Sequence, residues 1–499
     1  MQKIKIMTTN TLKIIRVFLF FLIFAFVSCS SDESLENSED PTSDLGESNR
    51  PNVEINIEDY QHQFIGGGTS IGLFLGHHYS MNAASQDLAI QYMANDLNMK
   101  YFQDYIEIYP EDDPEYYDRR ADYVLAAKQY KPDLEFSLVG QKFPNDLMVD
   151  KVINGQTLKV LDTDDPNIYD RVAMWYFRLL KGFHDRGVTT EILNVVNEPD
   201  LDRTFRKHHY GLNGDTKEAV ARIFEIAVPK FKALISDPTV NTTGMPQPLI
   251  MGPSSISPVG CIEYIQYIKT NYPDAWNNID IVATHQYENG ARVDLFRNIQ
   301  NISEGKPIYQ SETHALKGDG ITVVNAPRPL EAALSLSNLF TTAVNNGVSS
   351  WFYFENNYPN DFHPGGLMQV SWGAQAPIRY KHYFVFQQLT SLQPPNSSVV
   401  TASSSKQDTT SDVIAFRKEN ENDVYLTYTN YAPFQKFVSV TLKNTSGNAL
   451  DIKSYQVTST NADDNAALLE DENLNTPQQK IEVIVSGHSV NTIKLKIDN

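Results

Sequence analysis

The sequence predicts an α/β fold in which a (β/α)8 TIM barrel is followed by an antiparallel β-sandwich. Apolar, β-rich segments alternate with helical patterns over roughly 300 residues, as expected for eight βα units. From about residue 398 the helical patterns stop, and short strand-like segments separated by Asn, Ser, Asp and Gly take their place. A doubly wound sheet is the alternative, but it would normally carry a Gly-rich phosphate loop leading into a helix. Here Gly66–Gly68 leads into Thr69–Ile71 instead.

The first residues predict a targeting segment that is not part of the fold. Four basic residues precede the apolar run Val17–Val27, which is short for a membrane span: Lys3, Lys5, Lys13 and Arg16. The run ends in Phe26–Cys29, which resembles a bacterial lipobox, although leucine usually stands where Phe26 is. We therefore predict a lipoprotein signal peptide over residues 1–28 and lipidation of Cys29. An ordinary secretory signal with an incidental cysteine is the alternative.

Residues 29–50 are predicted to be a disordered acidic tether, because they contain almost nothing apolar to bury. The stretch Ser30–Glu33 resembles the surface-export signal of Bacteroidota lipoproteins. The expected location is the outer membrane of a Gram-negative bacterium, at the cell surface. The lipid anchor would be the only contact with the membrane.

Residues 51–397 are predicted to form the barrel. Its eight strands are expected at Phe64–Thr69, Lys100–Ile106, Leu134–Val139, Ile192–Val196, Pro248–Gly252, Ile279–Thr284, Pro307–Ser311 and Val348–Phe354. Helical patterns fill the gaps near residues 84–97, 115–129, 172–183, 216–236, 259–270, 291–302 and 329–346. The third of these patterns is the clearest, because its apolar residues recur three and four positions apart.

Residues 398–499 are predicted to form the sandwich. Strands are expected at Val413–Phe416, Val424–Tyr428, Phe437–Leu442, Ile452–Val457, Ile481–Val485 and Thr492–Ile497. The segment Val53–Ile57, before the barrel, is a candidate to join them, and residues 463–470 are the one candidate helix.

Composition excludes several classes of protein. The formal net charge is −20, which argues against nucleic acid as a partner, because phosphate contacts need basic surface. The chain has two cysteines, Cys29 and Cys261, so lipidation of the first would leave no intramolecular disulfide. No zinc-binding spacing is present, and we predict neither a metal nor a cofactor.

Two glutamates follow predicted strands, and they point to the chemistry. Glu198 stands in Asn197-Glu198-Pro199 after the fourth strand, and Glu312 follows the seventh. Catalytic side chains of a barrel sit at the carboxyl ends of its strands. Two carboxylates placed there are the minimal equipment for cleaving a glycosidic bond.

This pattern resembles clan A of the retaining glycoside hydrolases. The resemblance implies that Glu198 is the acid/base and that Glu312 is the nucleophile. Glu198 must then be protonated while Glu312 attacks as a carboxylate, which requires the higher pKa at Glu198. The resemblance also implies that Tyr287 orients the nucleophile. Asn197, beside Glu198, is well placed to hydrogen-bond a sugar 2-hydroxyl.

Further residues are candidates for substrate binding. His285 ends the sixth strand, Trp351 and Tyr353 share one face of the eighth, and Trp372 follows in a loop. Aromatic rings at these strand ends would stack on sugars. His77 and His78, near the first strand, could contact sugar hydroxyls. For the histidines and aromatics, structural packing is the alternative role.

The opening segment Tyr60–Tyr79 resembles family 86, which contains β-agarases and β-porphyranases, with family 30 a close second. The first resemblance implies endo-cleavage of a β-linked marine algal galactan, porphyran or agarose. Arg203 and Arg206 would suit the sulfate of porphyran. The single predicted sandwich departs from family 86, which often carries two, and leaves a family 30-like β-glucanase or xylanase open. A non-catalytic glycan-binding surface lipoprotein is the alternative of another class.

Overall fold

A computed structural model describes residues 50–497, apart from 71–74, 107, 154, 202–207, 210–215, 289, 318–323, 326–327, 360–361, 371–375, 392–395, 406–407 and 420. Four predicted functional residues lie outside this description: Cys29, Arg203, Arg206 and Trp372. So do the predicted signal peptide and almost all of the tether. Within the described part of the chain, no helix is long and apolar enough to cross a membrane.

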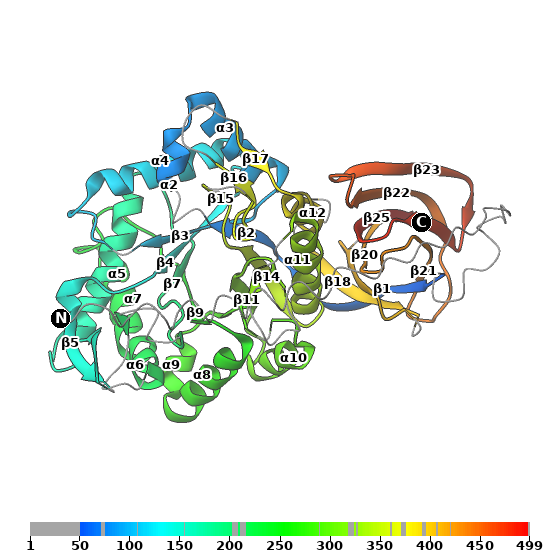
Figure 1. Ribbon diagram of the computed structural model, residues 1–499. Helices are drawn as coiled ribbons and strands as arrows, with labels where there is room; N and C mark the ends of the chain where they lie inside the picture. The colour runs from blue at the N-terminus through cyan, green and yellow to red at the C-terminus, as the bar shows by residue number, and fades with distance from the viewer. Residues whose placement is uncertain are drawn as a thin grey trace, which may run out of the picture. The chain divides into compact units, whose positions relative to one another are not determined.

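Eight parallel strands close into a barrel, which confirms the predicted fold class (Figure 1). In chain order they are β2 (Gly66–Ser70), β3 (Tyr101–Ile106), β4 (Glu135–Gly140), β7 (Ile192–Asn194), β9 (Leu249–Ser255), β10 (Ile281–His285), β11 (Ile308–Glu312) and β14 (Val348–Tyr353). Each of the eight overlaps a strand predicted from the sequence, and β14 pairs with β2 to close the ring.

Helices surround the barrel (Figure 1). They are α2 (Leu75–Ser80), α3 (Ala83–Gln91), α4 (Pro114–Tyr130), α5 (Ile168–His184), α6 (Thr216–Arg222), α7 (Val228–Ser236), α8 (Pro258–Asn271), α9 (Pro273–Asn277), α10 (Val293–Ile302), α11 (Pro329–Val344) and α12 (Lys381–Thr390). Short π and 3-10 turns complete them: η2 (Tyr92–Asp96), η3 (Asn145–Leu147) and η4 (Ile223–Ala227). The apolar stripe predicted on α5 is buried along its whole length.

Three small sheets lie in the loops. They contain β5 (Met148–Ile153), β6 (Gln156–Leu161) and β8 (His208–His209); β12 (Leu316–Lys317) and β13 (Val324–Asn325); and β15 (Asn357–Tyr358), β16 (Met368–Gln369) and β17 (Ile378–Arg379).

The glycine run of β2 has a packing explanation. A Cβ at Gly68 would lie 2.5 Å from a ring carbon of Phe352, and one at Gly67 would lie 2.5 Å from Thr390 Cγ2. The neighbouring strand and helix α12 therefore approach the backbone too closely for any side chain. The run is a strand of the barrel rather than a phosphate-binding loop.

Apolar and aromatic side chains fill the interior of the barrel below the carboxyl ends of its strands. They form one buried cluster: Tyr101, Ile192, Met251, Ile281, Ala283, Tyr309 and Phe352. Polar residues stand higher along the same strands, among them Gln103 and Gln310, and both are buried. The apolar layer thus fills the barrel beneath the polar groups at the strand ends.

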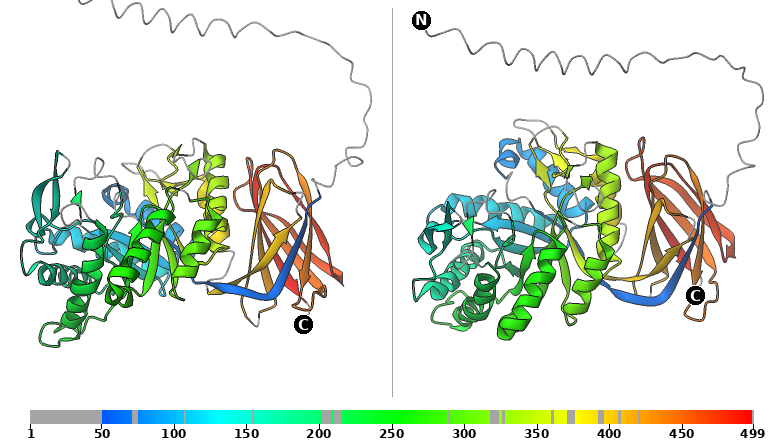
Figure 2. Two further views of the ribbon diagram at one scale, coloured as in Figure 1. Left: turned by 90° about the horizontal axis from the view of Figure 1, so that it is seen from below. Right: turned by 60° about the horizontal axis from the view of Figure 1, so that its bottom comes forward.

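The second domain is a nine-stranded sheet with its own apolar core (Figure 2). Its strands are β1 (Asn52–Phe64), β18 (Ser397–Ser404), β19 (Ser411–Arg417), β20 (Asp423–Asn430), β21 (Lys436–Lys443), β22 (Ile452–Thr460), β23 (Ala467–Gln478), β24 (Ile481–Val485) and β25 (Ser489–Ile497). The sheet is antiparallel except where β1 pairs in parallel with β21.

Two details of this domain differ from the sequence-based expectation. Residues 463–470 do not form a helix, because the second half of that stretch belongs to the exposed edge strand β23, which pairs with β22. Strand β18 was not expected, and it pairs with β1 on one side and β19 on the other.

Helices α11 and α12 contact the sheet domain directly. Ser337 and Thr429 share a hydrogen bond of 2.7 Å between their hydroxyls, and Gln388 Nε2 donates to the carbonyl of Thr458 at 2.9 Å. Phe416 and Val490, from the sheet, belong to the apolar core of the barrel. Residues 46–499 accordingly form one compact unit.

Candidate active site

Glu198 reaches the mouth of the barrel from a kinked segment after β7. Its φ of +47° lies in the left-handed region, which a glutamate rarely adopts. The backbone N–H of Glu198 donates to the carbonyl of Ser254 at 2.9 Å, and Ser254 itself has a φ of +50°. Two neighbouring strand ends therefore stabilise each other in uncommon conformations, a feature that clusters at functional sites.

Glu312 is the last residue of β11, and its carboxylate is held by two tyrosines. Tyr287 donates its hydroxyl to Oε1 at 2.8 Å, and Tyr105 donates to Oε2 at 2.6 Å. Each carboxylate oxygen of Glu312 therefore accepts one short hydrogen bond from a tyrosine hydroxyl. This arrangement favours the ionised form of Glu312 and fixes its orientation.

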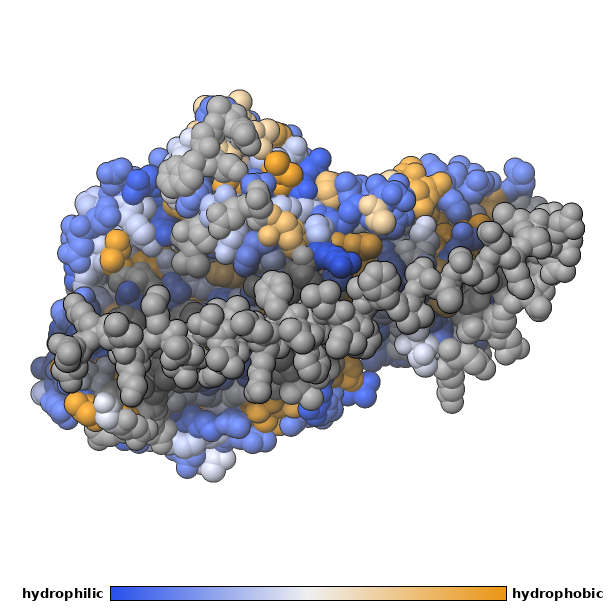
Figure 3. All heavy atoms as spheres, viewed as in Figure 1, coloured by the Kyte–Doolittle hydropathy of each residue, from blue (hydrophilic) through white to orange (hydrophobic). Residues whose placement is uncertain are grey.

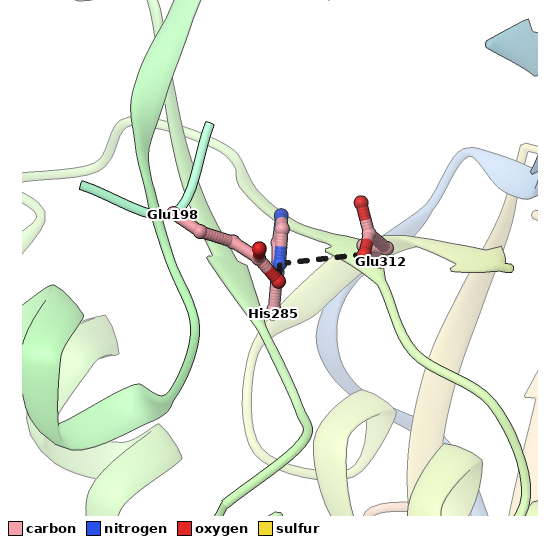
Figure 4. A group of neighbouring side chains, drawn as sticks. All are labelled: Glu198, His285 and Glu312. Atoms are coloured by element: carbon pink, nitrogen blue, oxygen red, sulfur yellow. Dashed lines mark hydrogen bonds and ion pairs between the residues drawn. The ribbon is translucent and has the colours of Figure 1, made fainter. Parts of the chain in front are cut away.

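His285, at the end of β10, stands between the two glutamates (Figure 4). Its Nδ1 lies 3.2 Å from Glu198 Oε1 and 3.9 Å from Glu312 Oε1. One carboxylate oxygen from each glutamate and a ring nitrogen of His285 all lie within 4.8 Å of one another. This separation fits the roughly 5–5.5 Å between the carboxyl groups of retaining glycosidases, and not the about 6.5–9.5 Å of inverting ones.

The close approach of these groups perturbs their protonation. Burial raises the pKa of Glu312, and the charge of Glu198 raises it further, while His285 and the two tyrosine hydroxyls lower it. Burial alone would lower the pKa of His285, but the charge of Glu312 and the hydrogen bond to Glu198 outweigh it, so that the pKa is raised. The groups therefore titrate as a coupled set. Both tyrosine hydroxyls donate to Glu312, which stabilises a negative charge on this carboxylate.

The residues around Glu198 are also buried. Asn197, which precedes it, is 2% exposed. Asp200 was not predicted as a site residue, yet burial raises its pKa to about 6. Its Oδ1 accepts the backbone N–H of Ile256 at 2.9 Å, and its Oδ2 fills the space that a side chain at Gly260 would need. Asp200 thereby ties the segment after Glu198 to the end of β9.

Tyr105 is the contact that the sequence reasoning missed. It lies in β3, and the alternation of strand residues places Tyr101, Gln103 and Tyr105 on one face. Since Tyr101 fills the barrel interior, the same alternation could have pointed Tyr105 toward the site.

The expectation that Trp351 and Tyr353 bind sugar is wrong. Both side chains are fully buried, and they pack against Phe386 of α12. Alternation along β14 correctly placed them on one face, but that face points outward to the helices. Phe354, on the opposite face, is half-buried and contacts the ring of Tyr105 edge-to-face at 5.8 Å. It is the aromatic side chain of this strand end that stands beside the site.

His285 and His78 also differ from their expected roles in substrate contact. His285 is fully buried between the carboxylates. His78 is buried in α2 against the ring of Tyr123, and burial lowers its pKa to about 4. His77 is half-buried on the same short helix. We assign neither His285 nor His78 to a sugar subsite, whereas the sugar contact of His77 stays a prediction.

Glu198, His285 and Glu312 are also the group of described residues that could hold a metal ion. A histidine must be neutral to bind a metal, and the raised pKa of His285 works against this. The two tyrosine hydroxyls further compete for the lone pairs of Glu312. The donor set thus suits proton transfer better than a metal.

Solved structures share this fold. A GH30 endoxylanase from Clostridium papyrosolvens C71 is 16% identical with a TM-score of 0.68, over 89% of this chain and 100% of that one. A conserved exported protein from Bacteroides fragilis is 12% identical with a TM-score of 0.66, over 89% and 99%. The endo-beta1,6-glucanase BT3312 is 15% identical with a TM-score of 0.63, over 89% and 94%. No family model and no curated protein matches the chain. At this identity the likeness establishes the fold: a barrel with an attached sheet domain, as in family 30 glycoside hydrolases.

Proposed function

We propose that the protein is a retaining β-glycoside hydrolase that cleaves within a polysaccharide. One observation carries the proposal: Glu198 and Glu312, from two strand ends of one barrel, bring their carboxylates within 4.8 Å around His285. The endo-acting enzymes among the proteins of the same fold support internal cleavage.

The geometry supports a double displacement. Glu312 attacks the anomeric carbon as the bond to the leaving oxygen breaks, and Glu198 gives that oxygen its proton. The charge on Glu312 is consumed by the new ester bond. Glu198, now a carboxylate, takes a proton from water, and the oxygen of that water displaces Glu312 from the sugar. Retention of configuration follows from the two inversions.

The neighbouring residues act on these two groups. Tyr287 holds Glu312 in the attacking orientation through its 2.8 Å hydrogen bond. His285 contacts Glu198 at 3.2 Å and lies near Glu312, so its charge couples the protonation of the two carboxylates. Asn197 is adjacent to Glu198, and we assign it the sugar 2-hydroxyl.

Two substrate classes compete. The opening segment of the sequence favours a marine algal galactan, porphyran or agarose. The names of the proteins with the same fold favour xylan or a β-1,6-glucan. The single sheet domain also agrees better with the second class, and the arginines that favoured a sulfated galactan lie outside the described residues. We rank xylan and β-glucan first.

The test is oligosaccharide release from xylan, β-1,6-glucan, β-1,3-glucan, agarose and porphyran. Glu312→Gln and Glu198→Gln should each lower the rate by at least about 1,000-fold. Asp200→Asn serves as a nearby carboxylate variant with a smaller loss. The first product seen by NMR should be the β-anomer.

Two other outcomes would contradict parts of this proposal. An α-anomer as first product would contradict the retaining mechanism. Binding of a polysaccharide without cleavage, unchanged in Glu312→Gln, would establish a glycan-binding protein in place of an enzyme.

We also propose that Cys29 carries a lipid that anchors the protein at the cell surface. The basic and apolar N-terminal pattern supports this. Cys29→Ala should move the protein from the membrane fraction to the soluble fraction. Retention of the variant in the membrane would contradict the proposal.

A further inference from the structure

A second residue of β3 controls the direction of the Tyr105 hydrogen bond. Gln103 Nε2 donates to the backbone carbonyl of Ser311 at 3.1 Å and to the hydroxyl oxygen of Tyr105 at 2.9 Å. A backbone carbonyl can only accept, so the amide of Gln103 must present its NH2 group to this side. The hydroxyl oxygen of Tyr105 therefore acts as an acceptor toward Gln103.

The hydroxyl proton of Tyr105 is therefore donated to Glu312. The hydroxyl lies 2.6 Å from Glu312 Oε2, and the side chain is buried at 3% exposure. A donated hydrogen bond to a carboxylate in a buried site is stronger than one between neutral groups. The direction of each hydrogen bond is thus fixed: the Gln103 amide donates to the Ser311 carbonyl and to the Tyr105 hydroxyl, and that hydroxyl donates to Glu312.

We infer that Tyr105, aligned by Gln103, stabilises the departure of Glu312 from the glycosyl-enzyme and thereby controls the second chemical step. The inference rests on the proposed function and deepens it. When water attacks the anomeric carbon, the bond to Glu312 breaks and the electron pair returns to the carboxylate. A permanent donor at Oε2 meets that growing charge without any rearrangement.

The same donor has a smaller effect on the first step. It stabilises the carboxylate of Glu312 before attack, so it lowers the energy of the reactant as well. Loss of the donor should therefore slow deglycosylation more than glycosylation. Gln103 is a positioning residue, because it acts through Tyr105.

The experiment compares Tyr105→Phe with Tyr101→Phe. Tyr101 lies on the same face of the same strand, is equally buried, and bonds to Tyr309 at 2.9 Å instead of to a carboxylate. With an activated aryl glycoside, Tyr105→Phe should lower kcat about 10- to 100-fold, lower KM as well, and release a burst of phenol equal to the enzyme concentration. Tyr101→Phe should show no burst and an unchanged KM.

Gln103→Met tests the alignment. It should produce a weaker burst on its own and no further change in a Tyr105→Phe background, because both act on one hydrogen bond. A full effect of Gln103→Met in the absence of the Tyr105 hydroxyl would overturn its role as a positioning residue.

A carboxyl NMR titration of Glu312, assigned with Glu312→Gln, does not depend on catalysis. The charged and titratable groups that surround Glu312 and Tyr105 are Glu198, His285, Tyr287 and Glu355, and all remain in place in the variant. Tyr105→Phe should move the Glu312 titration to higher pH, whereas Tyr101→Phe should not. An unmoved titration, or the same kinetic change in both variants, would overturn the inference. A shifted titration in a protein that cleaves no glycan would instead contradict only the proposed function.

Discussion

At the scale of single residues, the sequence predicted the side chains whose chemistry few other residue types can supply. Glu198 and Glu312 each follow a strand, and the structure brings them together around His285. Tyr287 was expected near the nucleophile and donates to Glu312. Tyr105 was missed because tyrosine is also an ordinary core residue, so its type alone does not indicate a site.

The aromatic residues of β14 show a second reason why a prediction from the sequence can fail. Alternation predicts that Trp351 and Tyr353 share a face, but it does not say which face points into the barrel. That choice depends on the neighbouring strand and helices. The indole of Trp351 donates to Gln286 Oε1 at 3.0 Å on the helix side, a contact that sequence reasoning could not supply.

The charge of His285 leads to a prediction about pH. Burial raises the pKa of Glu312. The acid limb of kcat/KM should therefore lie at a higher pH than the pKa of a free glutamate, which is about 4.3. The positive charge of His285 lowers the pKa of Glu312. His285→Asn should therefore move the acid limb to higher pH. A pH–rate profile measures this, and an acid limb that moves down would contradict the role given to His285.

Metal removal should leave the activity unchanged. Glu198, His285 and Glu312 offer ligand atoms within 4.8 Å, but two tyrosine hydroxyls already donate to Glu312, and the raised pKa of His285 disfavours the neutral form that binds metal. We expect full activity after dialysis against EDTA, with metal content followed by mass spectrometry. A loss that one divalent ion restores would show that the three residues form a metal centre.

At the scale of elements, segments with a marked apolar run or one clear apolar face were predictable, including the buried strands of the barrel, whereas α12 and β18 were not. Helix α12 buries seven of its ten residues, so it lacks the alternation of apolar and polar faces that marks a surface helix. Strand β18 has the sequence SSVVTASS, whose small residues resemble a loop. Their positions depend on partners from distant parts of the chain.

The glycines of β2 give a prediction at this scale. Gly68→Ala should destabilise the protein by about 1–3 kcal/mol, because the new Cβ would lie 2.5 Å from the ring of Phe352. Gly76→Ala is the matched control, since nothing lies within 4 Å of its Cβ position. The midpoints of chemical denaturation measure both changes. Equal midpoints for the two variants would show that β2 tolerates a side chain.

At the scale of the whole molecule, the barrel and the sheet domain depend on each other. The two bury apolar residues together, including Phe416 and Val490 against the barrel core. On the face drawn in Figure 3, the described residues are mostly hydrophilic. The sequence indicated the change of pattern near residue 398, but it could not show how much apolar surface the two domains share.

A chain that ends at residue 397 should therefore fail to give a soluble barrel. It would expose the faces of α11 and α12 that the sheet covers and leave β1 without its partners. A chain that begins at Arg50 is the control and should keep the melting temperature of the full protein. Soluble yield and thermal unfolding test both. A monomeric, active barrel from the first chain would contradict this dependence.

Strand β1 is synthesised long before the strands beside it. Its partners β18 and β21 follow Phe64 by roughly 330 residues and more, which a ribosome needs about 15–70 s to add. During that time an edge rich in Val and Ile has no native neighbour, and such edges pair readily with other chains. This strand carries three acidic residues, Glu54, Glu58 and Asp59, and like charges of this kind oppose association with a second copy of the strand. The order of synthesis thus requires that β1 resist association with other chains until β18 and β21 have been made, although in the folded protein these strands cover both of its edges.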